Sequence, residues 1–142
     1  MNRLQIASVR PNRPFVLEVT EPGDNGQGWV TVYSGVVALT GNPGFRGMVR
    51  STDVEQHSFF LPDAPPVTAV PSQLEVETSI RTHRATTGEA GGAVVVGAVR
   101  PQVAVAPDPR GEGGGPWLQV SFGLHPVGTV GCELNYRVSV WA

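Results

Sequence analysis

Two stretches near the C-terminal end of the chain alternate strictly between apolar and polar positions. They cover residues 117–125 and 133–141, on either side of a segment rich in proline and glycine. A period of two is typical of a β-strand with one buried face. The apolar sets are Leu118, Val120, Phe122 and Leu124 in the first stretch and Leu134, Tyr136, Val138 and Val140 in the second. We therefore predict two strands, paired as a hairpin, on which the other strands of an all-β fold pack.

The rest of the chain also favours short strands separated by turns. Further strands are expected at 15–20, 29–40, 46–54, 56–61, 73–83, 93–99 and 103–106, with a bulge at Gly35 and a turn at Asn25-Gly26. About eight or nine strands at this spacing indicate an antiparallel β-sandwich of immunoglobulin-like or jelly-roll type, with a small β-barrel as the alternative. The prolines of residues 62–66 suit a crossover between sheets, which favours the sandwich. We expect one domain over 1–142 with a flexible loop at about 107–116.

The last strand carries a tyrosine among alternating aliphatic residues. The pattern of Leu134, Tyr136, Val138 and Val140 resembles the tyrosine-bearing penultimate strand of fibronectin type III and other immunoglobulin-like modules. The resemblance covers nine residues. It implies a sandwich with one further strand after this one. Because no further strand follows in this sequence, a different sandwich, or a strand supplied by a neighbouring subunit, is an equal expectation.

Composition excludes several classes of partner. The net charge is −2 and the basic residues are scattered, which argues against nucleic-acid binding. No apolar run reaches the roughly 18 residues of a membrane span. No signal peptide is visible, so a cytoplasmic or virion location is expected. All ten basic residues are arginine, which indicates a GC-rich bacterium or its phage.

The histidines and the cysteine give no clear metal or cofactor site. His57, His83 and His125 suit metals by chemistry, but no two of them have the spacing of metal ligands. We therefore predict no metal and no cofactor. Cys132 is the only cysteine, which excludes an intramolecular disulfide. The carboxylate of Glu133 beside it is expected to raise the pKa of the thiol.

Two acidic clusters are candidates for acid–base chemistry. Asp53, Glu55 and His57 would share one face of a strand, as an acid–base cluster or as a charged, solvated edge. Glu75 and Glu77 would share a face with Arg81 and His83, as a carboxylate pair or as an ordinary solvent face. No oriented nucleophile accompanies either cluster, so we predict no catalytic residues.

The tryptophans are the strongest candidates for a binding surface. Trp117 and Trp141 lie opposite the aliphatic sets of their strands, and a hairpin would bring them together with Arg137. Exposed aromatic rings beside polar groups bind sugars or proteins. A covering layer is the other explanation for that face. We predict a binding site of Trp117, Trp141, Arg137 and Trp29.

These features favour a non-catalytic β-sandwich module that acts through protein–protein contact, either with a partner or with copies of itself. The expected class is an assembly, accessory or virion-decoration module. The first alternative is a carbohydrate- or ligand-binding module that uses the exposed tryptophans. The second is a small β-fold enzyme with its site at the Asp53, Glu55 and His57 edge.

Overall fold

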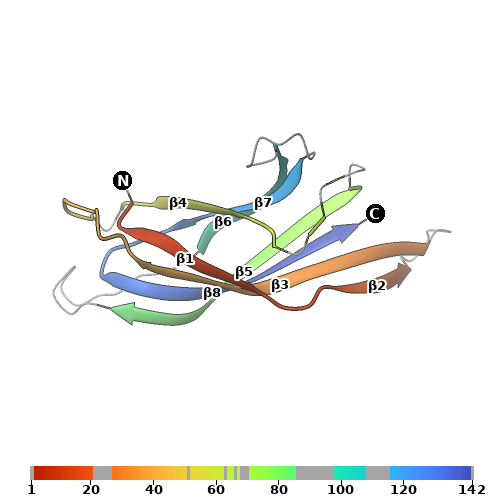
Figure 1. The fold of residues 1–142 in the computed structure, drawn as a ribbon, viewed down its shortest axis with the longest axis horizontal. Helices are drawn as coiled ribbons and strands as arrows, with labels where there is room; N and C mark the ends of the chain where they lie inside the picture. The colour runs from red at the N-terminus through yellow and green to blue at the C-terminus, as the bar shows by residue number, and fades with distance from the viewer. Residues whose placement is uncertain are drawn as a thin grey trace.

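The chain folds as a β-sandwich of two antiparallel sheets (Figure 1). This computed structural model describes residues 2–20, 27–50, 52–62, 64–65, 67, 71–85, 98–107 and 116–141. The strands in these residues are β1 (Leu4–Pro11), β2 (Phe15–Thr20), β3 (Gln27–Gly41), β4 (Glu55–Phe60), β5 (Gln73–Ala85), β6 (Ala98–Ala106), β7 (Trp117–Leu124) and β8 (Thr129–Trp141). They form two sheets rather than a closed barrel, so the sandwich prediction is confirmed.

The large sheet is organised around β3 and β8. Its order is β1-β3-β8-β5, and β2 also pairs with β3, beyond the end of β1. The last strand therefore lies between two earlier strands, and both of its edges are paired. The small sheet has the order β4-β7-β6. The end of the large sheet made by β2 and the start of β3 extends beyond β4 (Figure 1).

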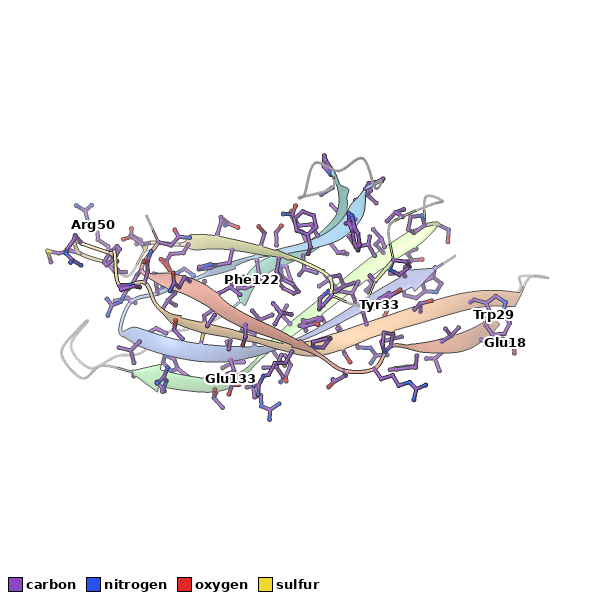
Figure 2. The ribbon with its side chains drawn as sticks, in the orientation of Figure 1. Glu18, Trp29, Tyr33, Arg50, Phe122 and Glu133 are labelled. Carbon is purple, nitrogen blue, oxygen red and sulfur yellow. The ribbon has the colours of Figure 1, made fainter. Side chains whose placement is uncertain are left out.

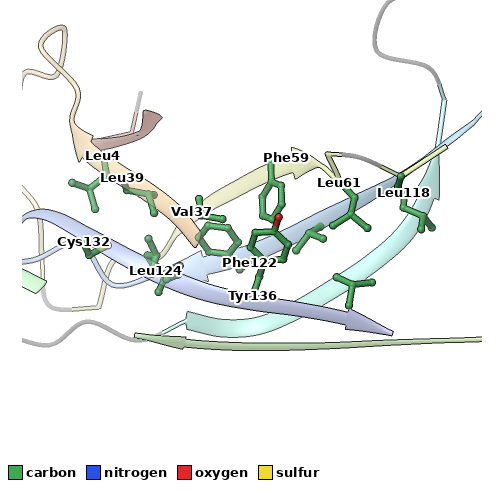
Figure 3. Close-up of a cluster of buried hydrophobic side chains, with 14 residues drawn as sticks. Leu4, Val37, Leu39, Phe59, Leu61, Leu118, Phe122, Leu124, Cys132 and Tyr136 are labelled. Atoms are coloured by element: carbon green, nitrogen blue, oxygen red, sulfur yellow. The ribbon is translucent and has the colours of Figure 1, made fainter. Parts of the chain in front are cut away.

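The core lies between the inner faces of the two sheets, meaning the faces that oppose each other. The small sheet contributes alternate residues of β7, and the large sheet contributes alternate residues of β3 and β8. Figure 3 shows Phe59, Phe122 and Tyr136 at the centre of this cluster. The buried set includes Leu4, Val37, Leu39, Phe59, Leu61, Leu118, Val120, Phe122, Leu124, Cys132, Leu134, Tyr136 and Val138. The faces predicted from the alternation of residues 117–141 are therefore confirmed.

The predicted hairpin between these two strands is wrong. β7 pairs with β4 and β6 in the small sheet, whereas β8 pairs with β3 and β5 in the large sheet. The two strands face each other across the core because both bury their apolar residues there. Alternation fixes which face of a strand is buried, but it does not choose the neighbouring strand.

The bulge predicted at Gly35 is also wrong, and a bulge lies elsewhere. Pairing between β3 and β8 runs through Gly35 and Tyr136 without a shift. The apolar pattern changes phase at Gly35 because Val30 and Val32 are buried on the outer face of the sheet. A real register shift occurs in β5 between Ile80 and Thr82. A bulge reverses the faces of the residues that follow it.

The connections agree in part with the sequence. The proline-rich segment after β4 does carry the chain from the small sheet to the large one. Residues 46–54 are not a strand, and β4 begins at Glu55. The turn expected at Asn25-Gly26, most of the strand expected at 93–99 and most of the loop expected at about 107–116 lie outside the described residues. Among those described, no helix is long and apolar enough to cross a membrane.

Candidate functional site

Glu55 and His57 lie inside the sandwich, and Glu55 is next to the start of β1. Both are buried, because the inner face of β4 carries Glu55, His57 and Phe59 in succession. The Glu55 carboxylate accepts hydrogen bonds from the backbone N–H groups of Arg3 and Leu4, the latter at 3.1 Å. Leu4 begins β1 of the other sheet and Arg3 directly precedes it, so this carboxylate ties the two sheets together. The expectation of a solvated edge is wrong for these two residues.

The His57 ring is held against the core rather than toward a cleft. It stacks on Phe122 with 5.7 Å between ring centroids, and its Nε2 lies 3.6 Å from Glu55 Oε1. Burial lowers the pKa of His57 from its ordinary value of 6.5, and Glu55 opposes this shift only in part. His57 is therefore neutral at neutral pH. Asp53 does not join the pair, because its carboxylate accepts a hydrogen bond from the Arg50 N–H at 2.8 Å.

This arrangement predicts a loss of stability in mild acid. Because the folded pKa of His57 is lowered, the unfolded chain binds more protons as the pH falls below about 6.5. The free energy of unfolding should therefore decrease from neutral pH toward the lowered pKa. His57→Phe, which keeps a ring on Phe122, should weaken this dependence of stability on pH.

Glu55→Gln should lower the free energy of unfolding by about 1.5–3 kcal/mol at neutral pH, as expected for the loss of hydrogen bonds to a charged group. Denaturant unfolding across this pH range measures both effects, and identical pH profiles for wild type and His57→Phe would contradict the assignment.

The other histidines contact different elements. His83 follows the β5 bulge, so it faces inward beside Cys132, and its Nε2 lies 3.1 Å from Thr129 Oγ1. His125 Nδ1 donates to the backbone oxygen of Asp53 at 3.2 Å. No cluster of three or more metal-ligating side chains occurs within the described residues.

The pKa of Cys132 is raised to about 11 by burial. The predicted direction is therefore right, but burial rather than Glu133 is its cause.

A groove on the outer face of the large sheet is the best candidate for a binding site. Its volume is about 240 Å³. We call it the Trp141 groove, and it is lined by Leu17, Val30, Val32, Glu75, Glu77, Arg137, Ser139 and Trp141. These residues come from β2, β3, β8 and β5, four strands that lie side by side. The floor of the groove is buried, since Val32 is only 1% exposed although it lies on the outer face of the sheet.

The groove has an apolar half and a charged half. Leu17, Val30 and Val32 form the apolar half over β2 and β3, and strand pairing places Leu17 opposite Val30 and Val30 opposite Trp141. The charged half lies over β8 and β5, where Glu77 is opposite Arg137 in the strand register. Neither Glu75 nor Glu77 forms an ion pair or a side-chain hydrogen bond within the part of the chain that the structure describes. Both carboxylates and the Arg137 guanidinium therefore line the same half of the groove.

The structure brings together two of the four predicted binding residues. Trp141 and Arg137 both line the groove. Trp29 is 52% exposed at one end of the large sheet (Figure 2). As the residue next to Val30 on β3, it lies on the opposite face of that strand from Val30. Trp117 belongs to the small sheet, where it pairs with Ala106, and its buried Nε1 has no hydrogen-bond partner among the described residues. The binding role of all four residues stays a prediction.

The apolar half of the groove was not predicted from the sequence. Val30 and Val32 did leave a signal, which is the change of apolar phase at Gly35. It indicates that the first part of the strand buries its other face. Leu17 left no such signal, because it alternates like any core residue of a strand. Met48 is 92% exposed, and nothing in the glycine-rich segment around it marks it in advance.

Comparisons with protein-family models, with curated proteins and with solved structures gave no match.

Proposed function

We propose that this protein is a non-catalytic β-sandwich module that assembles with further copies of itself through the β2 end of the large sheet. The observation that supports this is a concentration of exposed apolar side chains on one edge strand. Phe15, Val16 and Leu17 are 45%, 58% and 44% exposed, and Trp29 lies beside them on β3. Apolar surface gathered in one place on a folded domain is typical of a protein contact.

The edge position of β2 strengthens the proposal. Among the described strands, β2 pairs only with β3. An unpaired edge with apolar side chains on both faces offers backbone and side-chain contacts to another chain. Glu18 is the only charged residue of β2, so little on this strand opposes such a contact. Glu55 and His57, the strongest acid–base pair of the sequence, are occupied inside the core.

Light scattering coupled to size-exclusion chromatography tests the proposal. The mass of the wild-type protein should rise with concentration between the micromolar and millimolar ranges. Leu17→Asp places a charge in the apolar surface, and this variant should remain monomeric. Val105→Asp is the matched control, because Val105 is 42% exposed on β6 of the small sheet. A wild-type protein that stays monomeric throughout would end the proposal.

A further inference from the structure

The loop after β3 presents a second apolar feature, far from β2. We call residues 42–50 the Met48 loop. Met48 is the most exposed large apolar side chain of the described residues, and Gly47 before it has a φ of 128°. That backbone conformation favours glycine. It sets the direction of the chain at the residue directly before Met48. Covering an exposed methionine with an apolar surface lowers the free energy.

Hydrogen bonds hold the first half of the Met48 loop. The Asn42 N–H donates to the Arg3 carbonyl at 2.7 Å, and the Phe45 N–H donates to the Asn42 carbonyl at 3.0 Å. Arg46 Nη1 donates to the carbonyl oxygens of Pro43 and Phe45. A loop that is already ordered loses little conformational entropy when it binds. The part of the loop that precedes Met48 is therefore held in place.

The charges of the loop and the groove are complementary. The loop carries Arg46 and Arg50, both exposed and without a carboxylate partner among the described residues. The Trp141 groove carries the carboxylates of Glu75 and Glu77, which form no ion pair within the described residues, together with the single guanidinium of Arg137. Opposite charges that meet across an interface steer association and select the partner.

The loop and the groove lie at opposite ends of the molecule. Figure 2 shows Arg50 at one end of the long axis and Trp29 and Glu18 at the other. The groove shares strands β2 and β3 with Glu18 and Trp29, so it belongs to that second end. The loop of a chain therefore cannot reach its own groove, and a loop that enters the groove must come from a second copy.

The size of the groove suits a side chain better than a small molecule. Pockets for drug-sized ligands have volumes of about 300–1,000 Å³, and this one has about 240 Å³. An unbranched methionine adapts to an irregular apolar site, and its sulfur makes favourable contacts with aromatic rings. Trp141 offers such a ring at one end of the groove.

We propose that Met48 of one copy inserts into the Trp141 groove of the next copy, while Arg46 and Arg50 face Glu75 and Glu77. This inference rests on the proposed self-assembly and assigns its two complementary surfaces. Because the loop and the groove are different surfaces, the contact is head-to-tail, and a pair of copies keeps one free loop and one free groove. Head-to-tail contacts form rings or open filaments rather than closed dimers.

The first experiment compares Met48→Asp with the wild-type protein and the Val105→Asp control by light scattering. Met48 is exposed, so its replacement leaves the fold intact, which circular dichroism checks. We expect the association constant to fall at least about 30-fold, as for the loss of a central contact residue. Raising the salt concentration should weaken wild-type association, because the charges are exposed.

The second experiment mixes two variants that are each expected to be monomeric. Met48→Asp keeps its groove, and Leu17→Asp keeps its loop. An equimolar mixture should form a one-to-one dimer and grow no further, since only one functional contact remains. A contact between two copies of the same surface would not be restored by mixing.

The outcomes separate this inference from the proposed function. If the wild-type protein assembles, Leu17→Asp does not, and Met48→Asp assembles normally, self-assembly stands and the loop assignment is overturned. If both variants are monomeric and their mixture stays monomeric, the head-to-tail contact is overturned. If the wild-type protein itself is monomeric, both proposals fall.

Discussion

Replacing Gly35 by alanine should lower the free energy of unfolding by about 3 kcal/mol. A Cβ atom at this position would lie 2.6 Å from Tyr136 Oη, 2.8 Å from a ring carbon of Tyr136, and closer still to the Arg10 carbonyl oxygen. Backbone on one side and a buried ring on the other leave no room for it. Because alanine is otherwise the better strand residue by roughly 0.5–1 kcal/mol, the clash must exceed that gain.

Gly41→Ala is the matched control for this prediction. Gly41 ends the same strand, and a Cβ there would meet only the Val130 carbonyl oxygen, at 3.9 Å. We expect Gly41→Ala to be neutral or slightly stabilising. Denaturant unfolding of the two variants at one pH gives the comparison. Equal stability of the two variants would mean that the Tyr136 ring does not lie against Gly35.

The role of Gly35 shows what a local pattern can reveal. The change of apolar phase there is a true signal, but two causes produce the same signal. One is a bulge, which shifts the register of the strand. The other is a strand whose two ends bury opposite faces, and this is what β3 does. Only the neighbours of Val30 and Val32, which come from β2 and β8, distinguish the two causes.

Alternation in the sequence predicted which face of a strand is buried, but not which strands are neighbours. Alternation over residues 117–141 correctly placed Leu118 and Leu134 in the core, because a buried face requires apolar residues at every second position. It could not assign the two strands to different sheets. Strand partners depend on the path of the whole chain, and the proline-rich crossover was the one local signal of that path.

The buried pair Glu55 and His57 was hidden for a different reason. Their common face was correctly predicted, but charge suggested solvent. The carboxylate is stable in the core because the N–H groups of Arg3 and Leu4 bind it, more than fifty residues away in the sequence. A hydrogen bond over such a separation leaves no local pattern. Burial of a charged group requires a partner of this kind.

The largest effect on stability is expected from Phe122→Ala, at about 3–5 kcal/mol. Phe122 is 1% exposed, and it lies between His57 and Phe59, with 6.5 Å between the centroids of the two phenylalanine rings. Its removal leaves a cavity in the layer where the two sheets meet (Figure 3). Such a loss is a large fraction of the roughly 5–15 kcal/mol that stabilises a typical domain.

The same substitution should also change the titration of His57. Burial lowers the pKa of His57, and Phe122 supplies part of that burial. In Phe122→Ala, water that reaches the imidazole should raise this pKa back toward 6.5, so stability should depend less on pH below neutrality. Phe60→Ala is the control, because Phe60 is half-buried on the outer face of β4, and it should cost roughly 1 kcal/mol or less. Nuclear magnetic resonance titration of His57 in both variants measures the shift. An unchanged pKa in Phe122→Ala would show that Phe122 does not shield His57 from water.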